Sequence, residues 1–352
     1  MSGVSAIRRG QATAAAVVAI ALVSVGPAGA AVPVPVYGPA ADPGVAHASG
    51  EYVAFTTGSL TLVARGASAS GPWSSRGSAL DRLGSWSSGG PVWAPDAWQT
   101  AAGWVQYYAA PARGMEGQRC IGVATADDAT GPYLPADPPL VCPNAALGAD
   151  DQVPGRPVAD AGVIDPAPFL AFDGRRFLLY KTQQRPSTLR MVRLGPEGLH
   201  TISASRELRQ SPGIIENPAM VQRGRRFVLF ASRHGWAGCG YATVWFRSMR
   251  PWAFADKSQH VLARTGTTGI CGPGGMDVVR RDNGARIFLH GWRCKYRTGI
   301  RNCASSADVS NRVSFRSMYA GVLGWGPDRA TPRVARFLTP ASSPAAAVGA
   351  RR

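Results

Sequence analysis

The sequence lacks the short motifs on which most hydrolases depend. It contains no G-x-S-x-G nucleophile elbow, no H-E-x-x-H zinc helix and no Gly-Lys-Ser/Thr phosphate loop. It also has no C-x-x-C pair and no cluster of cysteine with histidine, which argues against a structural zinc ion. Serine-hydrolase, zinc-peptidase and nucleotide-dependent chemistry therefore have no support, and any hydrolytic chemistry has to come from carboxylates.

Lysine is nearly absent, although the chain is strongly basic. The formal net charge is +17, yet only Lys181, Lys257 and Lys295 are lysines among the 38 basic residues. No block of five or six basic residues occurs, and the N-terminal export signal described below argues against nucleic acid as a partner. A solvated, arginine-rich surface is the simplest explanation of the positive charge, and association with an anionic cell envelope or an acidic polysaccharide is the alternative.

Long apolar runs are missing beyond the N-terminus, which predicts no transmembrane span. Residues 1–30 combine Arg8-Arg9, the apolar run 14–25 and the small residues Ala28-Gly29-Ala30, which is the pattern of a signal peptide. We therefore predict a secreted, extracellular protein, with retention of this run as an anchor as the alternative. The Ala/Ser/Pro-rich residues 341–352 predict a disordered tail, which leaves 31–340 for the folded domain.

The six cysteines lack metal-binding spacing, so in an exported chain they predict disulfides. Six cysteines allow fifteen connectivities, and sequence alone does not choose among them. Order along the chain favours the pairs Cys120 with Cys142, Cys239 with Cys271 and Cys294 with Cys303.

No long segment shows the 3.6-residue period of an amphipathic helix, and a β-repeat takes its place. Five times, an acid or glycine beside a proline is followed about ten residues later by an aromatic-rich strand. The openings are Asp42-Pro43, Trp93-Ala94-Pro95-Asp96, Asp165-Pro166, Glu216-Asn217-Pro218 and Gly272-Pro273-Gly274, and the strands are 52–55, 104–108, 177–180, 227–230 and 287–290. Spacings of roughly 50 to 70 residues fit one four-stranded blade each, so we predict an all-β, five-bladed β-propeller.

The openings of the repeats carry acids that the fold should bring together. The first strand of each propeller blade lines the central channel, so residues at the same point of successive repeats converge. Asp42, Asp165 and Glu216 should therefore meet around one channel. A single acid before proline more often caps a turn or a strand, but three acids at matching points of a repeat favour a functional site.

These motifs, in this order, resemble those of family 43 glycoside hydrolases, five-bladed propellers that include arabinanases, arabinofuranosidases, xylosidases and galactan-degrading enzymes. The resemblance covers residues 40–335, as short motifs between divergent segments. It implies that Asp42 is the general base, Glu216 the general acid and Asp165 the aspartate that tunes and orients the acid. The segment 93–96 is similar to the family's second-blade signature.

Two carboxyl groups on opposite sides of a sugar suit inverting hydrolysis. One carboxylic acid protonates the leaving oxygen while a carboxylate activates water, and the two lie about 6.5 to 9.5 Å apart. Glu216 must then hold a proton near neutral pH, which an ionised Asp165 nearby would favour by like-charge repulsion. Asp42 must stay ionised, which predicts polar, hydrogen-bonded surroundings for it.

Trp93, Asp96, Phe169 and Arg316 are the candidates for substrate binding. Trp93 and Phe169 lie beside the acids in sequence and could stack on a sugar face, although core packing would explain each equally well. Asp96 either lines the floor of the site or holds the second blade through backbone hydrogen bonds. Arg316, within residues 313–318, resembles an arginine that the family places near the active centre, where it could orient a carboxylate or a sugar hydroxyl.

The fifth blade departs from the family pattern. Where the family often reads Gly-Pro-Gly-His, this chain has Gly275 after Gly272-Pro273-Gly274, and in many relatives that histidine helps to hold a central cation or touches the substrate. His290 matches a separate family histidine and is the candidate metal ligand, although a histidine beside a tryptophan is more often structural. The resemblance implies that no cofactor is required and leaves a central calcium ion open.

Together these features predict a secreted inverting glycoside hydrolase that cleaves arabinofuranosyl, xylosyl or galactofuranosyl linkages in plant or cell-wall polysaccharide. Its expected partner is a polysaccharide or oligosaccharide substrate. The main alternative is a non-catalytic carbohydrate-binding propeller, which the missing histidine favours and the three intact acids oppose. A third hypothesis, a basic protein held to the envelope by charge, predicts binding that moderate salt abolishes.

Overall fold

The computed structural model describes residues 31–143, 162–183, 185–281 and 284–341. The predicted signal peptide and nearly all of the predicted tail lie outside this part of the chain. Every strand and helix belongs to the unit that begins at Val32. Within the described ranges, no helix has the length and apolar character needed to cross a membrane.

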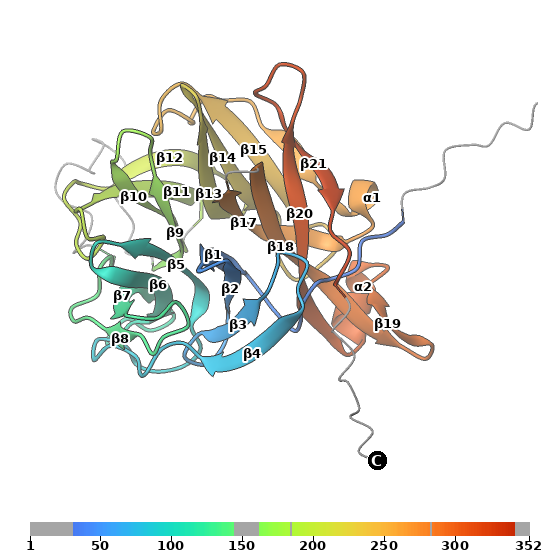
Figure 1. The fold of residues 1–352 in the computed structure, drawn as a ribbon, viewed down its shortest axis with the longest axis horizontal. Coiled ribbons are helices and arrows are strands. Elements are labelled where there is room, and N and C mark those ends of the chain that lie inside the picture. Colours follow the sequence, from blue (N-terminus) through green and yellow to red (C-terminus); the bar gives the residue numbers. More distant parts are fainter. Residues whose placement is uncertain (1–30, 144–161, 184, 282–283, 342–352) are drawn as a thin grey trace, which may run out of the picture. The chain divides into compact units, whose positions relative to one another are not determined.

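Antiparallel sheets follow one another along the chain, and there are five of them, as the repeat predicted (Figure 1). The first three blades contain β1 Gly44–Ala48, β2 Glu51–Thr56, β3 Leu62–Gly66 and β4 Trp73–Ser78; β5 Trp93–Thr100, β6 Gly103–Pro111, β7 Arg119–Ala126 and β8 Leu134–Pro135; and β9 Val163–Leu170, β10 Arg176–Thr182, β11 Ser187–Leu194 and β12 Arg206–Ser211. The last two contain β13 Ile215–Arg223, β14 Arg226–Arg233, β15 Ala242–Ser248 and β16 His260–Ala263; and β17 Cys271–Arg281, β18 Gly284–Tyr296, β19 Gly299–Asn302, β20 Ser314–Trp325 and β21 Pro332–Phe337. Two short helices, α1 Thr265–Thr268 and α2 Ser306–Asn311, complete the described elements.

The first strands of the blades, β1, β5, β9, β13 and β17, surround the central axis (Figure 1). Each contacts the next, and β17 contacts β1, so the inner strands form a closed ring. The chain is therefore the five-bladed β-propeller that the repeats predicted. The opening ends of the inner strands face the same end of the channel, which brings the motif residues together.

The hydrophobic core lies between neighbouring blades. Between the third and fourth blades Leu179 packs with Leu229, and between the first and fifth blades the ring centroids of Tyr52 and Phe288 lie 5.6 Å apart. The predicted aromatic-rich strands are the second strands of the blades, and both of their faces are buried against adjacent sheets. Burial on both faces explains why these strands read as continuous apolar runs rather than as alternating patterns.

The ring is closed by the N-terminal segment 36–40, which lies beside β20 of the last blade. Val36 N–H donates to the Met318 carbonyl at 2.8 Å, and Ala40 N–H donates to the Arg316 carbonyl at 2.8 Å. Strand β21 pairs with β20 only from Gly321 onward, so the N-terminal segment continues the outer edge where β21 stops. The first and last parts of the described chain thus share one sheet.

The three disulfides have the predicted connectivity: Cys120–Cys142, Cys239–Cys271 and Cys294–Cys303. Among them, Cys239–Cys271 links the fourth blade to the start of β17, whereas the other two join residues within one blade. The residues that it joins are 32 positions apart, against 9 for Cys294–Cys303. Its loop is the longest of the three.

We expect loss of Cys239–Cys271 to destabilise the protein more than loss of Cys294–Cys303. By reducing the entropy of the unfolded chain, closure of the longer loop contributes about 3 to 4 kcal/mol to the free energy of unfolding, and closure of the shorter loop about 2.5 kcal/mol. Urea unfolding of Cys239→Ser/Cys271→Ser and of Cys294→Ser/Cys303→Ser under oxidising conditions measures the difference. A larger loss for the second variant would contradict the loop-length argument.

Candidate active site

Each blade has left-handed backbone near the start of its inner strand. The residues are Asp42, Ala94, Asp165 and Asn217 in the first four blades and Gly272 and Gly275 in the fifth, with φ between 40° and 62°. The first four precede proline, which normally keeps the residue before it extended. Such backbone costs roughly 1 to 3 kcal/mol in a non-glycine residue and clusters at functional sites. The repeat therefore places a strained residue at the same point of the first four blades, and glycine takes this backbone in the fifth.

Glu216 is one residue out of step with the other two acids. Asp42 and Asp165 occupy the left-handed position of their blades, whereas Asn217 occupies it in the fourth blade and Glu216 precedes it. The sequence spacing predicted three equivalent positions, so the structure differs here. Because successive side chains of a strand point in different directions, Glu216 leaves its strand in another direction from Asp42 and Asp165.

A pocket of about 380 Å³ at this end of the channel brings the three acids together. Its lining includes Asp42, Asp165 and Glu216, together with the predicted substrate-binding residues Trp93 and Arg316. This volume lies in the usual range for small-ligand sites, about 300 to 1,000 Å³. The sequence therefore identified five residues of one pocket that are far apart along the chain.

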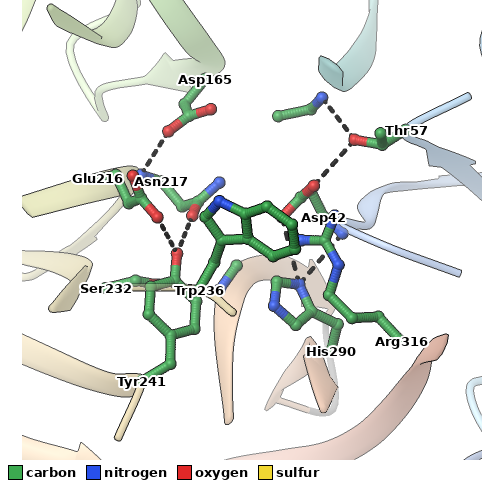
Figure 2. Close-up of polar contacts among 12 residues, drawn as sticks. Asp42, Thr57, Asp165, Glu216, Asn217, Ser232, Trp236, Tyr241, His290 and Arg316 are labelled. Carbon is green, nitrogen blue, oxygen red and sulfur yellow. Dashed lines mark hydrogen bonds and ion pairs between the residues drawn. The ribbon is translucent and has the colours of Figure 1, made fainter. Parts of the chain in front are cut away.

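Asp42 is held as an ionised carboxylate. Arg316 Nη1 donates to Asp42 Oδ1 at 2.8 Å, and Thr57 Oγ1 donates to Oδ2 at 2.8 Å (Figure 2). Burial would raise the pKa of Asp42, but the charge of Arg316 and the hydrogen bond from Thr57 outweigh it and hold the pKa well below its usual range. These are the polar surroundings that the sequence predicted for a base.

Glu216 lies across the site, in contact with groups that the sequence did not single out. Lys181 Nζ, on β10 of the third blade, donates to Glu216 Oε2 at 2.9 Å. Tyr241 Oη donates to Glu216 Oε1 at 2.8 Å and also lies 2.5 Å from Asn217 Oδ1 (Figure 2). Both carboxylate oxygens are therefore held by neighbours, and Lys181 balances the buried charge.

Asp165 accepts a hydrogen bond from the backbone N–H of Asn217, 3.0 Å from its Oδ2. Burial, and then the neighbouring Glu216 charge, raise the pKa of Asp165 to about 7, while Lys181 acts in the opposite direction. The sequence predicted an ionised Asp165 beside a protonated Glu216. The structure instead gives Asp165 the raised pKa and Glu216 the lysine, because the cation contacts only Glu216.

Asp96 lies below the pocket, in a narrow cavity of about 30 Å³ lined also by Asp277. It is 7% exposed, and its Oδ1 accepts a hydrogen bond from the Ala97 N–H at 2.7 Å. Burial and the nearby Asp277 carboxyl raise the pKa of Asp96 well above its ordinary value, and burial raises the pKa of Asp277 to about 6. Asp96 therefore belongs to a buried acid pair in the channel and does not line the larger pocket.

The two predicted aromatic contacts have different surroundings. Trp93 lies at the pocket with 37% of its surface exposed, and the Arg119 guanidinium lies 3.4 Å from its ring centroid. Phe169 is buried between the third and fourth blades, where its ring lies 6.1 Å from that of Phe177. Phe169 is thus a core residue, because its side chain leaves β9 on the face that packs against the next blade.

Trp236 is an aromatic pocket residue that the sequence gave no reason to select. Its ring stacks on Trp292 with centroids 5.9 Å apart, the Arg316 guanidinium lies 4.9 Å from its centroid, and 47% of its surface is exposed. Figure 2 shows it beside Asp42 and Arg316. It lies between strands, in a segment without a repeat motif, so no periodic signal marked it.

His290, the candidate metal ligand, has two nitrogens with different surroundings. Its Nδ1 accepts the backbone N–H of Asp42 at 3.1 Å and lies 3.3 Å from Asp42 Oδ1. Burial, and then Arg316, lower the pKa of His290, so the ring is neutral. Its Nε2 is buried without a hydrogen-bond partner in the part of the chain that the structure describes. Among the described residues, no group of three or more His, Cys, Asp or Glu side chains could hold a metal ion.

Gly275 explains why the fifth blade has no second histidine. A Cβ at this position would lie 2.6 Å from His290 Nδ1 and 3.1 Å from Asp42 Oδ1. The backbone of Gly275 is also left-handed, with φ of 57°. The His290 ring therefore fills the space that a side chain at position 275 would need.

The pocket carries one carboxylate and one carboxyl pair on separate blades. Asp42 has lost its proton and is fixed by Arg316, whereas Asp165 and Glu216 share a buried site with a raised pKa at Asp165. Such a division suits a reaction in which one side removes a proton and the other supplies one. Trp93 and Trp236 add aromatic surface to the lining of the same pocket.

Comparisons with known proteins agree with this geometry. A family model described as "Glycosyl hydrolases family 43" matches residues 33–304. Among solved structures, the chain is similar to a thermostable family-43 glycoside hydrolase, with a TM-score of 0.64 and 16% identity over 87% of this chain and 95% of that one. It is also similar to an exo-1,5-alpha-L-arabinanase from a bovine ruminal metagenomic library, with a TM-score of 0.63 and 17% identity over 86% and 98%.

A further similar structure is a Cellvibrio cellulosa alpha-L-arabinanase complexed with arabinohexaose, with a TM-score of 0.64 and 16% identity over 86% of this chain and 96% of that one. At these identities the structural matches bear on the fold alone. No curated protein matches the sequence.

The acid pair below the pocket predicts a pH dependence of stability. Because the pKa of Asp96 is raised on folding, its stabilising contribution is complete below the unfolded pKa of about 3.9 and is lost as pH rises through the folded value. Asp96→Asn removes that loss. We expect its melting temperature, relative to wild type, to rise as pH increases above 5 and to level off above the folded pKa of Asp96.

Differential scanning calorimetry across this range measures the effect, with Asp127→Asn at an exposed position as the matched control. A constant difference between Asp96→Asn and wild type at all pH values would show that the pair does not titrate as described.

Proposed function

Because this chain belongs to family 43 of the glycosyl hydrolases and is therefore a glycoside hydrolase, we propose that it acts with inversion, using Asp42 as base and Glu216 as acid. Asp165 tunes and orients the acid. The observation that carries the proposal is the electrostatic contrast across one pocket. Asp42 is fixed as a carboxylate by Arg316, while the opposite wall holds a buried carboxyl pair.

The proposed reaction balances around one water molecule and one sugar. Asp42 removes a proton from water as the water oxygen bonds to the anomeric carbon. The bond from that carbon to the leaving oxygen breaks, and Glu216 gives the leaving oxygen a proton. Asp42 ends protonated and Glu216 ionised, and solvent restores both. The new hydroxyl lies opposite the departing group, so the configuration inverts, and the reaction needs no cofactor.

Lys181 and Asp165 both influence the proton that Glu216 supplies. When Glu216 is ionised, the ammonium at 2.9 Å stabilises it, which favours departure of the proton. Asp165, with a pKa of about 7, holds a proton close to this carboxylate near neutral pH. The proton for the leaving group is thus a property of the Asp165 and Glu216 pair rather than of Glu216 alone.

The proposed substrate is an arabinofuranosyl, xylosyl or galactofuranosyl linkage in plant or cell-wall polysaccharide, and the proposed location is extracellular. Trp93 and Trp236 offer ring surface for a sugar face, and Arg316 offers donors for a hydroxyl. The similarity to an arabinanase complexed with arabinohexaose supports an oligosaccharide ligand. Three disulfides are compatible with an oxidising compartment.

A non-catalytic carbohydrate-binding propeller is the second candidate, and the Lys181 to Glu216 ion pair is the observation that favours it. A lysine that held Glu216 permanently ionised would leave no general acid. Hydrolysis of arabinan, arabinoxylan, arabinogalactan and aryl furanosides separates the two candidates. Turnover with inverted product, followed by NMR, establishes the enzyme, whereas binding of one glycan without turnover establishes the alternative.

Glu216→Gln should slow hydrolysis in proportion to how much the leaving group needs a proton. For a sugar leaving group we expect a loss of roughly 10²- to 10⁴-fold, the usual contribution of a general acid. A dinitrophenyl glycoside, whose leaving group departs unprotonated, should lose far less. Steady-state kcat on both substrates measures this, and an equal loss on both would exclude Glu216 as the acid.

Lys181→Met should move the basic limb of the kcat/KM profile to higher pH. The ammonium opposes the rise in the pKa of Asp165, so without it the Asp165 and Glu216 pair keeps its proton as pH rises. Lys181→Arg preserves the charge and should leave the limb near its wild-type position. A Lys181→Met profile that falls in height without moving would mean that Lys181 acts only on packing.

A further inference from the structure

A second group of charged residues lies at the far end of the third and fourth blades. The turn between β9 and β10 continues as Asp173-Gly174-Arg175-Arg176, and the turn between β13 and β14 reads Arg223-Gly224-Arg225-Arg226. Glu216 is the second residue of β13 and Arg223 the last, so seven steps of about 3.3 Å, roughly 23 Å, separate them. The arginines therefore lie on the face opposite the candidate active site.

Contacts between blades place these turns on one surface. Phe172 N–H donates to Gln222 Oε1 at 2.7 Å, which joins the third blade to the fourth. Arg223 Nε donates to the Arg329 carbonyl at 2.7 Å, which joins the fourth blade to the fifth. This far face is thus continuous across three blades.

A pocket of about 470 Å³ opens on this face beside the start of β14 and the end of β15. Its lining contains four cationic side chains, Arg226, Arg247, Arg250 and Lys257. The remaining lining comes from the segment 248–253 and includes neither an aromatic nor an acidic side chain. The charged side chains of the lining are therefore all hydrogen-bond donors, which suits a ligand rich in acceptors.

The loop that carries half of these cations is fixed in place. Arg209 Nη1 donates to the carbonyls of Phe254, Ala255 and Lys257 at 3.0, 2.9 and 2.7 Å. Arg250 N–H donates to Ser248 Oγ at 3.1 Å. The pocket wall is therefore held by hydrogen bonds before any ligand arrives, which lowers the entropy cost of binding.

Two of the four cations remain available for a ligand. Arg247 pairs with Asp328 at 3.2 Å, and Lys257 pairs with Asp256 at 3.0 Å. Within the described ranges, the guanidinium groups of Arg226 and Arg250 have no hydrogen-bond or ion-pair partner, and both residues are exposed. Guanidinium groups bind carboxylates with paired hydrogen bonds, so these two arginines form the centre of the site.

We propose that this pocket binds the carboxylate groups of an acidic polysaccharide, at a site separate from the one that carries out hydrolysis. The four cationic side chains of the lining favour an oxyanion, and the volume exceeds what a free phosphate or carboxylate ion would fill but suits a carboxylated sugar unit. The two faces of the propeller then engage different parts of a wall polysaccharide. The site goes beyond the proposed hydrolysis and does not depend on it.

Isothermal titration of the full-length protein with tetragalacturonate and with its fully methyl-esterified form tests the proposal. The first carries the carboxylates, and the second is a neutral chain of matched shape. We expect Arg226→Ser/Arg250→Ser to weaken tetragalacturonate binding about tenfold or more, and Arg226→Lys/Arg250→Lys to retain most of it. The methyl ester should not bind at this pocket.

The matched control is Arg76→Ser/Arg297→Ser, which removes the same charge from exposed positions elsewhere on the propeller. It should bind tetragalacturonate as wild type does. Equal weakening by both double variants would overturn the proposal, because net charge rather than the pocket would then explain the binding. Inorganic phosphate binding without tetragalacturonate binding would overturn the assignment to a carboxylated sugar, as would equal affinity for the methyl ester.

Two further measurements keep the result interpretable. Thermal melting shows whether Arg226→Ser/Arg250→Ser is folded, and if it is not, the lysine pair and a single Arg250→Ser replace it in the titration. Hydrolysis of an aryl furanoside should be unchanged in the folded variants, because the altered residues lie on the opposite face. Loss of hydrolysis together with loss of binding would overturn the claim that the two sites are separate.

Discussion

The contact of Asp42 with the last blade is the interaction on which the site depends. Its backbone N–H donates to His290 and its carboxylate accepts from Arg316, which lie 248 and 274 positions later in the chain. Just before it, residues 36–40 pair with β20. The position and the ionisation of Asp42 are therefore consequences of closing the ring, and not of the first blade alone.

Glu216, like Asp42, is paired with a cation from a neighbouring blade. Glu216 on the fourth blade is balanced by Lys181 on the third, just as Asp42 on the first blade is balanced by Arg316 on the fifth. A buried ion costs several kcal/mol unless it is paired, so each pair makes the charge of one blade depend on correct packing of its neighbour. Among the described residues no cation contacts Asp165, and burial and the Glu216 charge accordingly raise the pKa of Asp165.

The sequence predicted the fold and the central acids because both depend on the repeat. Proline beside an acid marks the inner strands, and apolar runs such as 227–230 mark the second strands that two neighbouring sheets cover. Phe169 could not be assigned in the same way, since the register between β10 and β9 shifts between Leu179 and Lys181, and the repeat does not show which face a residue of β9 then takes. The offset of Glu216 was missed because Asn217, and not the acid, takes the left-handed position of the fourth blade.

Lys181 was missed for a different reason, although the sequence does carry a signal for it. A lysine directly after the apolar run Phe177–Tyr180 must be buried with a partner or lie at a strand end, and spacing alone does not name the anion that it meets. Trp236 and Tyr241 lie between strands, where no period operates. Their positions follow from tertiary contacts that only the folded ring defines.

The contacts of Asp42 with the last blade form only when the whole propeller has been synthesised. Synthesis proceeds from the N-terminus, so the proposed base is made early, but the arginine that fixes its charge is among the last residues of the propeller to emerge. A chain that stops within the fourth blade could pack several sheets and still lack the arginine that fixes this carboxylate. If Asp42 acts as the proposed base, such fragments would be inactive rather than partly active.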